Sequence, residues 1–197
     1  MKIVYLYPSL AVWGGVERIL VDKMNYLARE YGDEVYIITS DQGPHHIPYY
    51  LDERVHHVDM NIRFHTQYRY GLARRQWVRR RMLREYFIKL NQMLTDIQPD
   101  IVVCTTVHNI RRLLKVKGKI PLIVESHFNF SHPDSWWHLI QNRINNYWIG
   151  KAEAVVALTD RDAEDWKRVS RHVHVIPNVV HLNDSNMYSD CTAKRVL

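Results

Sequence analysis

Short apolar runs alternate with longer amphipathic stretches along this chain. Several runs are nearly continuous in Val, Ile and Leu, as is typical of strands covered on both faces of a sheet. We predict strands at Lys2–Tyr7, Glu34–Ser40, Val55–Met60, Asp100–Thr105, Pro121–His127, Ala154–Thr159 and His172–Ile176. Strands that alternate with helices in this way predict an α/β protein with a mostly parallel sheet and helices on both faces.

Between these runs, apolar residues recur at the spacing of a helix. The spacing predicts a helix over Val16–Tyr31 and a long helix that ends before Pro99, whose apolar positions run from Leu83 to Ile97. Further helices are predicted over Asp134–Lys151, with Asp134 as the N-cap, and from Thr159 onward. Because crossovers between parallel strands are right-handed, these elements predict a Rossmann-like, doubly wound layer. Such layers bind ligands at the carboxyl ends of their strands.

Two adjacent glycines, Gly14 and Gly15, join the first predicted strand to its helix. They match neither the dinucleotide fingerprint nor the Walker A loop, which disfavours nicotinamide enzymes and P-loop NTPases. Free main-chain N–H groups at a helix start suit a phosphate, and the missing Cβ atoms would let it approach. A turn that requires positive φ explains the pair equally well. Both interpretations stay open on the sequence pattern alone.

The segments that follow the first, fourth and fifth predicted strands are the places where this fold would hold a ligand. Glu125 and His127 lie two positions apart, so an ideal strand presents both on one face. A structural histidine is the alternative to a functional one, and the helix dipole alone explains Glu17. We expect contacts to a ligand in the crevice at this edge of the sheet from six residues: Trp13, Glu17, Thr105, His108, Glu125 and Asn129.

The whole chain has a formal net charge of +6, and much of its positive charge is concentrated in one segment. Six arginines, with Trp77 among them, crowd the beginning of the long helix: Arg74, Arg75, Arg79, Arg80, Arg81 and Arg84. A solvated surface and a docking site for anionic lipid headgroups both explain them. No signature of a nucleic-acid-binding fold accompanies the charge, so no nucleic acid partner is expected.

The cysteines and the remaining acidic residues limit the chemistry further. Cys104 and Cys191 have no paired spacing, which favours a reducing, cytoplasmic setting over a disulfide framework. A peripheral position on the inner face of the membrane would fit the arginines. Asp160 and Asp162 form an Asp-x-Asp pair where a helix start favours acidic side chains. We therefore expect no metal and no cofactor, with a metal-dependent transferase using this pair as an alternative.

The end of the chain has a different pattern from the rest. Residues 178–190 are polar and lack periodicity, and residues 193–197 turn apolar again. We predict one domain over residues 1–178, followed at 179–197 by a linker and the first strand of a second, truncated domain.

Four stretches, in order along the chain, resemble the N-terminal half of family 4 glycosyltransferases. They are GGVERIL, ESHFN, AVVALTDRDAEDW and VHVIPNVV, which begin at Gly14, Glu125, Ala154 and Val173. The resemblance implies the GT-B architecture of two facing Rossmann-like domains, and retaining sugar transfer without a metal. It also implies that Gly14 and Gly15 approach the diphosphate of a nucleotide-sugar and that His127 is catalytic, near the transferred sugar.

One feature of that family is absent here. Its paired glutamates with seven residues between them, which contact the donor, have no counterpart, since no two glutamates in this chain are eight positions apart. They would belong to the missing C-terminal domain, so this chain alone is expected to be inactive. The expected partners are a nucleotide-sugar donor, a glycan or lipid-linked acceptor and that domain. A non-catalytic module that binds an anionic surface is the alternative.

Overall fold

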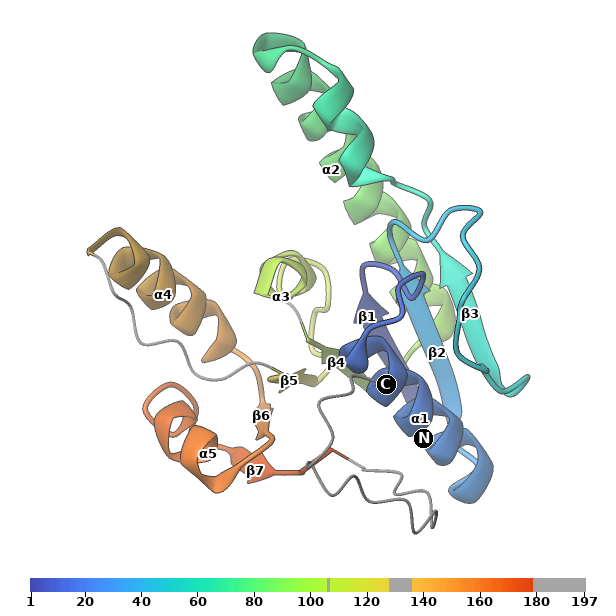
Figure 1. Ribbon diagram of the computed structural model, residues 1–197, viewed down its shortest axis with the longest axis vertical. Helices are drawn as coiled ribbons and strands as arrows, with labels where there is room; N and C mark the ends of the chain where they lie inside the picture. The colour runs from blue at the N-terminus through green and yellow to red at the C-terminus, as the bar shows by residue number, and fades with distance from the viewer. Residues whose placement is uncertain (106, 128–135, 179–197) are drawn as a thin grey trace, which may run out of the picture.

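A single parallel sheet organises the protein. The computed structural model describes residues 1–105, 107–127 and 136–178. Its strands lie in the order β3-β2-β1-β4-β5-β6-β7, and every neighbouring pair is parallel (Figure 1). They are β1 (Lys2–Tyr7), β2 (Glu34–Thr39), β3 (Val55–Asp59), β4 (Ile101–Cys104), β5 (Leu122–Glu125), β6 (Ala154–Ala157) and β7 (Val173–Val175).

Helices connect these strands. They are α1 (Gly15–Glu30), the 3-10 helix η1 (Phe64–Arg69), α2 (Leu72–Ile97), α3 (Val107–Leu113), α4 (Trp136–Ile149) and α5 (Asp160–Trp166). Within the described residues, no helix is both long and apolar enough to cross a membrane.

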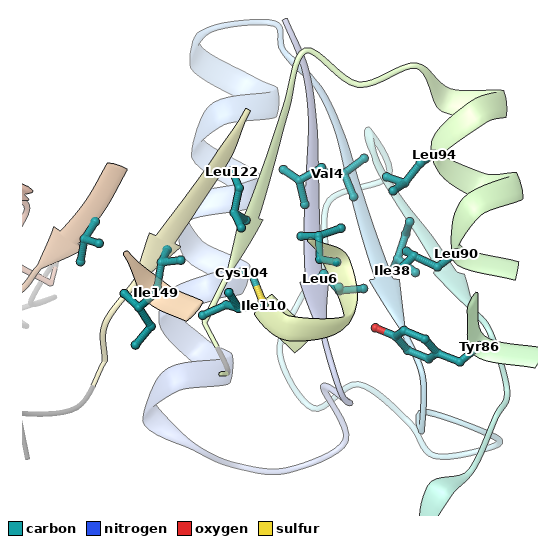
Figure 2. Packing of buried hydrophobic residues seen from close by; sticks show 14 of the residues in the cluster. Val4, Leu6, Ile38, Tyr86, Leu90, Leu94, Cys104, Ile110, Leu122 and Ile149 are labelled. Atoms are coloured by element: carbon teal, nitrogen blue, oxygen red, sulfur yellow. The ribbon is translucent and has the colours of Figure 1, made fainter. Parts of the chain in front are cut away.

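Alternating side chains of the strands build two separate cores. In β1, Ile3 and Tyr5 pack with α1 on one face of the sheet, while Val4 and Leu6 pack on the other. The second face is the larger and is covered by α2, α3, α4 and α5, whose contributions include Tyr86, Ile110, Ile149 and Trp166. Figure 2 shows several of these side chains meeting those of the central strands. The sheet is therefore Rossmann-like, with helices on both faces, as the apolar runs predict.

The apolar repeat marks only the second half of α2. The helix begins at Leu72, near the first of the six arginines, and its buried residues, Tyr86, Leu90 and Leu94, all lie in its second half. Its first half stands clear of the sheet, at the top of Figure 1. Without a core to face, that half needs no apolar stripe, so periodicity could not reveal it. The short helix α3 gave no periodic signal either.

The cap of α5 is confirmed, whereas the last predicted residues of β5 are not strand. Thr159 Oγ1 accepts a hydrogen bond from the Asp162 main-chain N–H and donates one to the Asp162 carboxylate. β5 ends at Glu125, so His127 lies two residues beyond the strand instead of inside it. The predicted N-cap Asp134, and the linker and strand predicted at 179–197, lie outside the described residues.

Candidate functional site

The carboxyl edge of the sheet contains the point where the chain changes direction. From β1 the chain winds outward through β2 and β3, then returns to β4 on the other side of β1. The segments after β1 and β4 therefore leave toward opposite faces, because α1 packs in one core and α3 in the other. Ligands of doubly wound sheets bind at such a switch point.

The glycine pair lies in the segment that follows β1. Gly14 caps α1 in an extended conformation, with φ −112° and ψ 153°, and Gly15 is the first residue of the helix. Neither has positive φ. A turn that requires positive φ therefore does not explain the pair, and that interpretation is wrong. A Cβ atom at Gly15 would meet nothing within 4 Å, so the first residue of α1 has open space on its Cβ side.

Glu17 occupies the space over Gly14. The Tyr7 hydroxyl donates a hydrogen bond of 2.8 Å to Glu17 Oε1. A Cβ atom at Gly14 would lie 2.0 Å from Glu17 Oε2, so the carboxylate folds directly over the glycine. Burial and this hydrogen bond raise the pKa of Tyr7, which keeps it a neutral donor. The start of α1 thus already holds one anionic group, on a side chain that can swing away.

Trp13 forms the rim of the segment between β1 and α1, hereafter called the glycine segment. Its side chain is 77% exposed, and the indole meets the Tyr49 ring edge to face with 5.3 Å between the centroids. The Tyr49 hydroxyl donates to the Gly14 carbonyl, which ties the rim to the glycine. An exposed indole held this way presents a flat apolar surface beside the helix start.

A chain of three charged or polar side chains links α1 to the end of β5. Lys23 Nζ lies 3.3 Å from Glu125 Oε1, and His127 Nε2 lies 3.3 Å from Glu125 Oε2. Because a carboxylate only accepts, Nε2 carries the proton in this contact. The His127 side chain is only 2% exposed, and its Nδ1 is buried without a partner among the described residues. Glu125 therefore fixes the orientation of the imidazole.

Burial and pairing act on Glu125 in opposite directions. Burial raises the pKa of its carboxyl, but the hydrogen bond from His127 and the Lys23 ammonium outweigh it, so the pKa lies below its ordinary value of 4.5. A lowered pKa means that the ionised carboxylate stabilises the fold. This stabilisation is fully present above the unfolded-state pKa and is lost as pH falls through the folded-state pKa.

Glu125→Gln is therefore expected to be less stable than the wild type at neutral pH, with the difference shrinking as pH falls below 4.5. Urea unfolding at neutral and acidic pH measures this difference. Glu164→Gln removes an exposed carboxyl from α5 and is the matched control. A stability gap between wild type and Glu125→Gln that stays constant with pH would contradict the assignment.

The other residues predicted for the cleft are only partly located. Thr105 follows β4 directly, and its Oγ1 is buried without a partner among the described residues. His108 lies in α3, but its side chain lies outside the described part, as does Asn129 entirely. Asp160 and Asp162 lie in the first turn of α5, where both suit the helix dipole. Within the described residues, no three His, Cys, Asp or Glu side chains group closely enough to hold a metal ion.

The six arginines of α2 separate into two sets. Arg75 and Arg79 line a cavity of about 580 Å³ together with Arg112 of α3, while the other four, all exposed, do not line it. The remaining lining residues come from the ends of β1 and β2, from η1 and from α3: Pro8, Ser40, Asp41, Phe64, His65, Gln67, Tyr68 and Asn109. Reasoning from the sequence missed Arg112 and Asp41. For Asp41, its position after β2, at the carboxyl edge of the sheet, was a signal that could have marked it as a site residue.

The sequence pattern of the family described as Glycosyltransferase Family 4 matches residues 13–184, which is most of the chain. The chain belongs to glycosyltransferase family 4. The match begins just before the glycine pair and includes both Glu125 and His127. No curated protein matches the chain.

Solved structures share the fold of this family 4 chain. The apo lipopolysaccharide outer core galactosyltransferase WaaB superposes with a TM-score of 0.62 at 15% identity, over 93% of this chain and 47% of its own. Sucrose-phosphate synthase from Thermosynechococcus elongatus gives 0.65 at 11% identity, over 90% and 48%. Anabaena HepE, solved with UDP-glucose, gives 0.56 at 19% identity, over 90% and 44%. The chain thus has the fold of one half of a GT-B glycosyltransferase and spans slightly less than half of these proteins.

Proposed function

We propose that this chain is the acceptor-side domain of a retaining glycosyltransferase that moves a sugar from a nucleotide-diphosphate sugar to a glycan or lipid-linked acceptor. The observation that carries this proposal is the open space beside Gly15 at the start of α1: a Cβ atom there would meet nothing within 4 Å, so a ligand at the carboxyl edge of the sheet can approach the main chain. Membership of family 4 supports it. So does HepE, which was solved with UDP-glucose, with UDP and glucose, and with UDP.

The start of α1 would act on the leaving group. As the bond between the sugar and the diphosphate breaks, negative charge grows on the phosphate oxygens, and main-chain N–H groups at a helix start stabilise that charge. Glu17 must first swing away from Gly14, because two anions cannot share that position. Among the described residues its carboxylate accepts a hydrogen bond only from the Tyr7 hydroxyl, so this movement breaks one hydrogen bond.

His127 would act beside the transferred sugar. Glu125 and Lys23 set the orientation of its ring, which leaves Nδ1 as the atom available to a substrate. Because Nδ1 is buried, contact with a sugar requires a movement of the residues around it. We propose that donor binding causes that movement, and that the second, donor-binding domain supplies the paired glutamates that this chain lacks. The chain alone would then be inactive.

A second candidate role is contact with an anionic membrane surface. Arg74, Arg80, Arg81 and Arg84 are exposed on the half of α2 that stands clear of the sheet, and Trp77 beside them is 62% exposed. Basic side chains and an exposed indole on one helix suit a surface of anionic lipid headgroups. This role adds to sugar transfer, because it would bring the domain to a lipid-linked acceptor.

Titration of UDP-glucose and other nucleotide-sugars into the intact protein, meaning this chain with its second domain, tests the proposal. We expect one nucleotide-sugar to bind and to be slowly hydrolysed without an acceptor, and we expect chelation of divalent metals to change neither result. This chain alone should bind the same donor much more weakly. Failure of every nucleotide-sugar to bind the intact protein would refute the proposal, and activity that requires manganese would favour Asp160 and Asp162.

A further inference from the structure

We propose that the cavity lined by Arg75, Arg79 and Arg112 binds a phosphate group carried by the acceptor. This inference rests on the proposed function, because only a transferase needs an acceptor, and it adds the chemical class of that acceptor. The cavity is hereafter called the arginine pocket. It is distinct from the glycine segment proposed to bind the donor diphosphate.

The arginine pocket lies at the same edge of the sheet as the glycine segment. Pro8, the residue that follows β1, lines the pocket and begins the segment that leads to Gly14. The main-chain N–H groups of Ser40 and Asp41 both donate to the Pro8 carbonyl, at 3.1 and 2.9 Å, which ties the end of β2 to that of β1. A group bound in the pocket therefore lies at the ligand-binding edge, on the α2 side of the switch point.

The pocket has an excess of positive charge. Three guanidinium groups face it, against the single carboxylate of Asp41. That carboxylate is already used within the fold, since it accepts hydrogen bonds from the Ser40 hydroxyl and from the Phe64 main-chain N–H. Among the residues that the structure describes, no carboxylate lies within 4.0 Å of any of the three arginines. The pocket therefore lacks the anion that its cations would pair with.

Aromatic rings hold two of these guanidinium groups in place. Arg112 stacks over the Phe64 ring, at 4.3 Å from the centroid, and lies 5.0 Å from that of Tyr86. Arg75 lies 4.0 Å over the Tyr68 ring. Stacking uses the flat face of a guanidinium and leaves the N–H groups at its edge free to donate. The donors are thus oriented before a ligand arrives.

Burial distinguishes Arg112 from an ordinary surface arginine. The side chain is partly withdrawn from water, and burial lowers the pKa of its guanidinium. Asp41 acts on this guanidinium through its charge but lies beyond 4.0 Å, and a bound anion in direct contact would stabilise the partly buried cation further. Gln67 adds a polar group suited to a sugar: it is 7% exposed, and its Oε1 accepts no hydrogen bond from the described residues. A sugar hydroxyl could donate to that oxygen.

Phosphate fits this arrangement better than a neutral sugar does. Arginine forks match the geometry of phosphate oxygens and bind them through pairs of charge-assisted hydrogen bonds. The cavity volume of about 580 Å³ is within the range that holds a small ligand. A phosphorylated sugar and the phosphate of a lipid-linked acceptor present the same chemistry to it.

Isothermal titration of glucose 6-phosphate into the intact protein tests this proposal, with glucose as the uncharged comparison. We expect glucose 6-phosphate to bind, and Arg79→Gln/Arg112→Gln to weaken binding by at least about 30-fold, since two charge-assisted interactions are lost. Arg80→Gln/Arg84→Gln removes the same charge from exposed positions of α2 and should change the affinity less than about 2-fold, because such charges are largely screened. Equal effects of the two double variants, or equal binding of glucose, would overturn the proposal.

Vesicles distinguish the two sources of phosphate. If the acceptor is lipid-linked, vesicles containing phosphatidic acid should compete with glucose 6-phosphate in the wild type, and Arg79→Gln/Arg112→Gln should abolish that competition. If the acceptor is soluble, the vesicles should not compete, and glucose 6-phosphate binding should still depend on the pocket. A third outcome is that Arg80→Gln/Arg84→Gln reduces vesicle binding and Arg79→Gln/Arg112→Gln does not. That result would assign the lipid contact to the exposed arginines and would contradict a lipid phosphate in the pocket.

Two further measurements keep the result interpretable. Arg79 is exposed and, among the described residues, stacks on no aromatic ring, unlike Arg75 and Arg112, so the single variant Arg79→Gln should fold normally and still weaken glucose 6-phosphate binding. UDP-glucose binding should be unchanged in the pocket variants. If the wild type binds no nucleotide-sugar, the proposed function is refuted. If it binds a nucleotide-sugar but the pocket variants do not change glucose 6-phosphate binding, only the arginine pocket is refuted.

Discussion

Replacing Gly15 with leucine is expected to raise the KM for the nucleotide-sugar by about 10- to 100-fold while the protein stays folded. Hydrogen bonds to a charged phosphate contribute about 1.5–3 kcal/mol, and each 1.4 kcal/mol is about a factor of ten. A Cβ atom at Gly15 meets nothing within 4 Å, so a side chain can start there without a clash, and leucine would fill the space through which a diphosphate would approach. Steady-state kinetics of the intact enzyme measure the change.

The structure offers a matched control for this substitution. Gly71 precedes α2 as Gly14 precedes α1, and a Cβ atom there also meets nothing within 4 Å. Gly71→Leu should leave the donor KM unchanged. Leucine is a better helix former than glycine, so Gly15→Leu should not lower the melting temperature through α1 itself. An unchanged donor KM in Gly15→Leu would contradict the phosphate role of the glycine pair.

Removal of the His127 imidazole is expected to lower kcat by about 100-fold or more with little change in the KM for donor, since a lost stabilising group at the reacting centre typically costs about that much. The reason is its proposed position beside the transferred sugar, with its ring oriented by Glu125 and Lys23. His127→Ala and His127→Gln are compared with the wild type by kcat and by melting temperature, because a side chain with 2% exposure also contributes to packing.

His57→Ala is the matched control for this loss. His57 is also partly buried and interacts with Thr39 Oγ1 at 2.9 Å, but it lies on β3 at the far edge of the sheet. It should lower stability without changing kcat per folded molecule. A purely structural His127 would give the same result as His57, with kcat per folded molecule intact, and would remove His127 from the catalytic machinery.

Local features of the fold were predictable, and their accuracy has a physical cause. The β1 run Lys2–Tyr7 was predicted to the residue, because a strand buried on both faces must be apolar throughout. The α5 cap at Thr159 was equally accessible, since capping depends on residues three positions apart. The first half of α2 carries no apolar repeat, because it packs on no core, and only its arginines marked it in the sequence.

The candidate site was only partly predictable, because several of its features depend on contacts between distant parts of the chain. The position of Gly14 and Gly15 follows from the order of strand and helix, but their φ angles, which removed the competing turn explanation, came only from the fold. Glu125 and His127 were expected on one face of a strand, but the strand ends at Glu125, and the contact between the two side chains came only from the fold. Lys23, which completes that network, comes from a helix about a hundred residues earlier in the chain.

By itself, then, the sequence determined where the strands lie to within a few residues, where α5 is capped and that two glycines join β1 to α1, because each of these depends on neighbours within a few positions. Only the tertiary structure brought Asp41, Arg79 and Arg112 into one cavity. Their meeting depends on β1 lying between β2 and β4, and strand order is set by the packing of the whole sheet rather than by any local pattern.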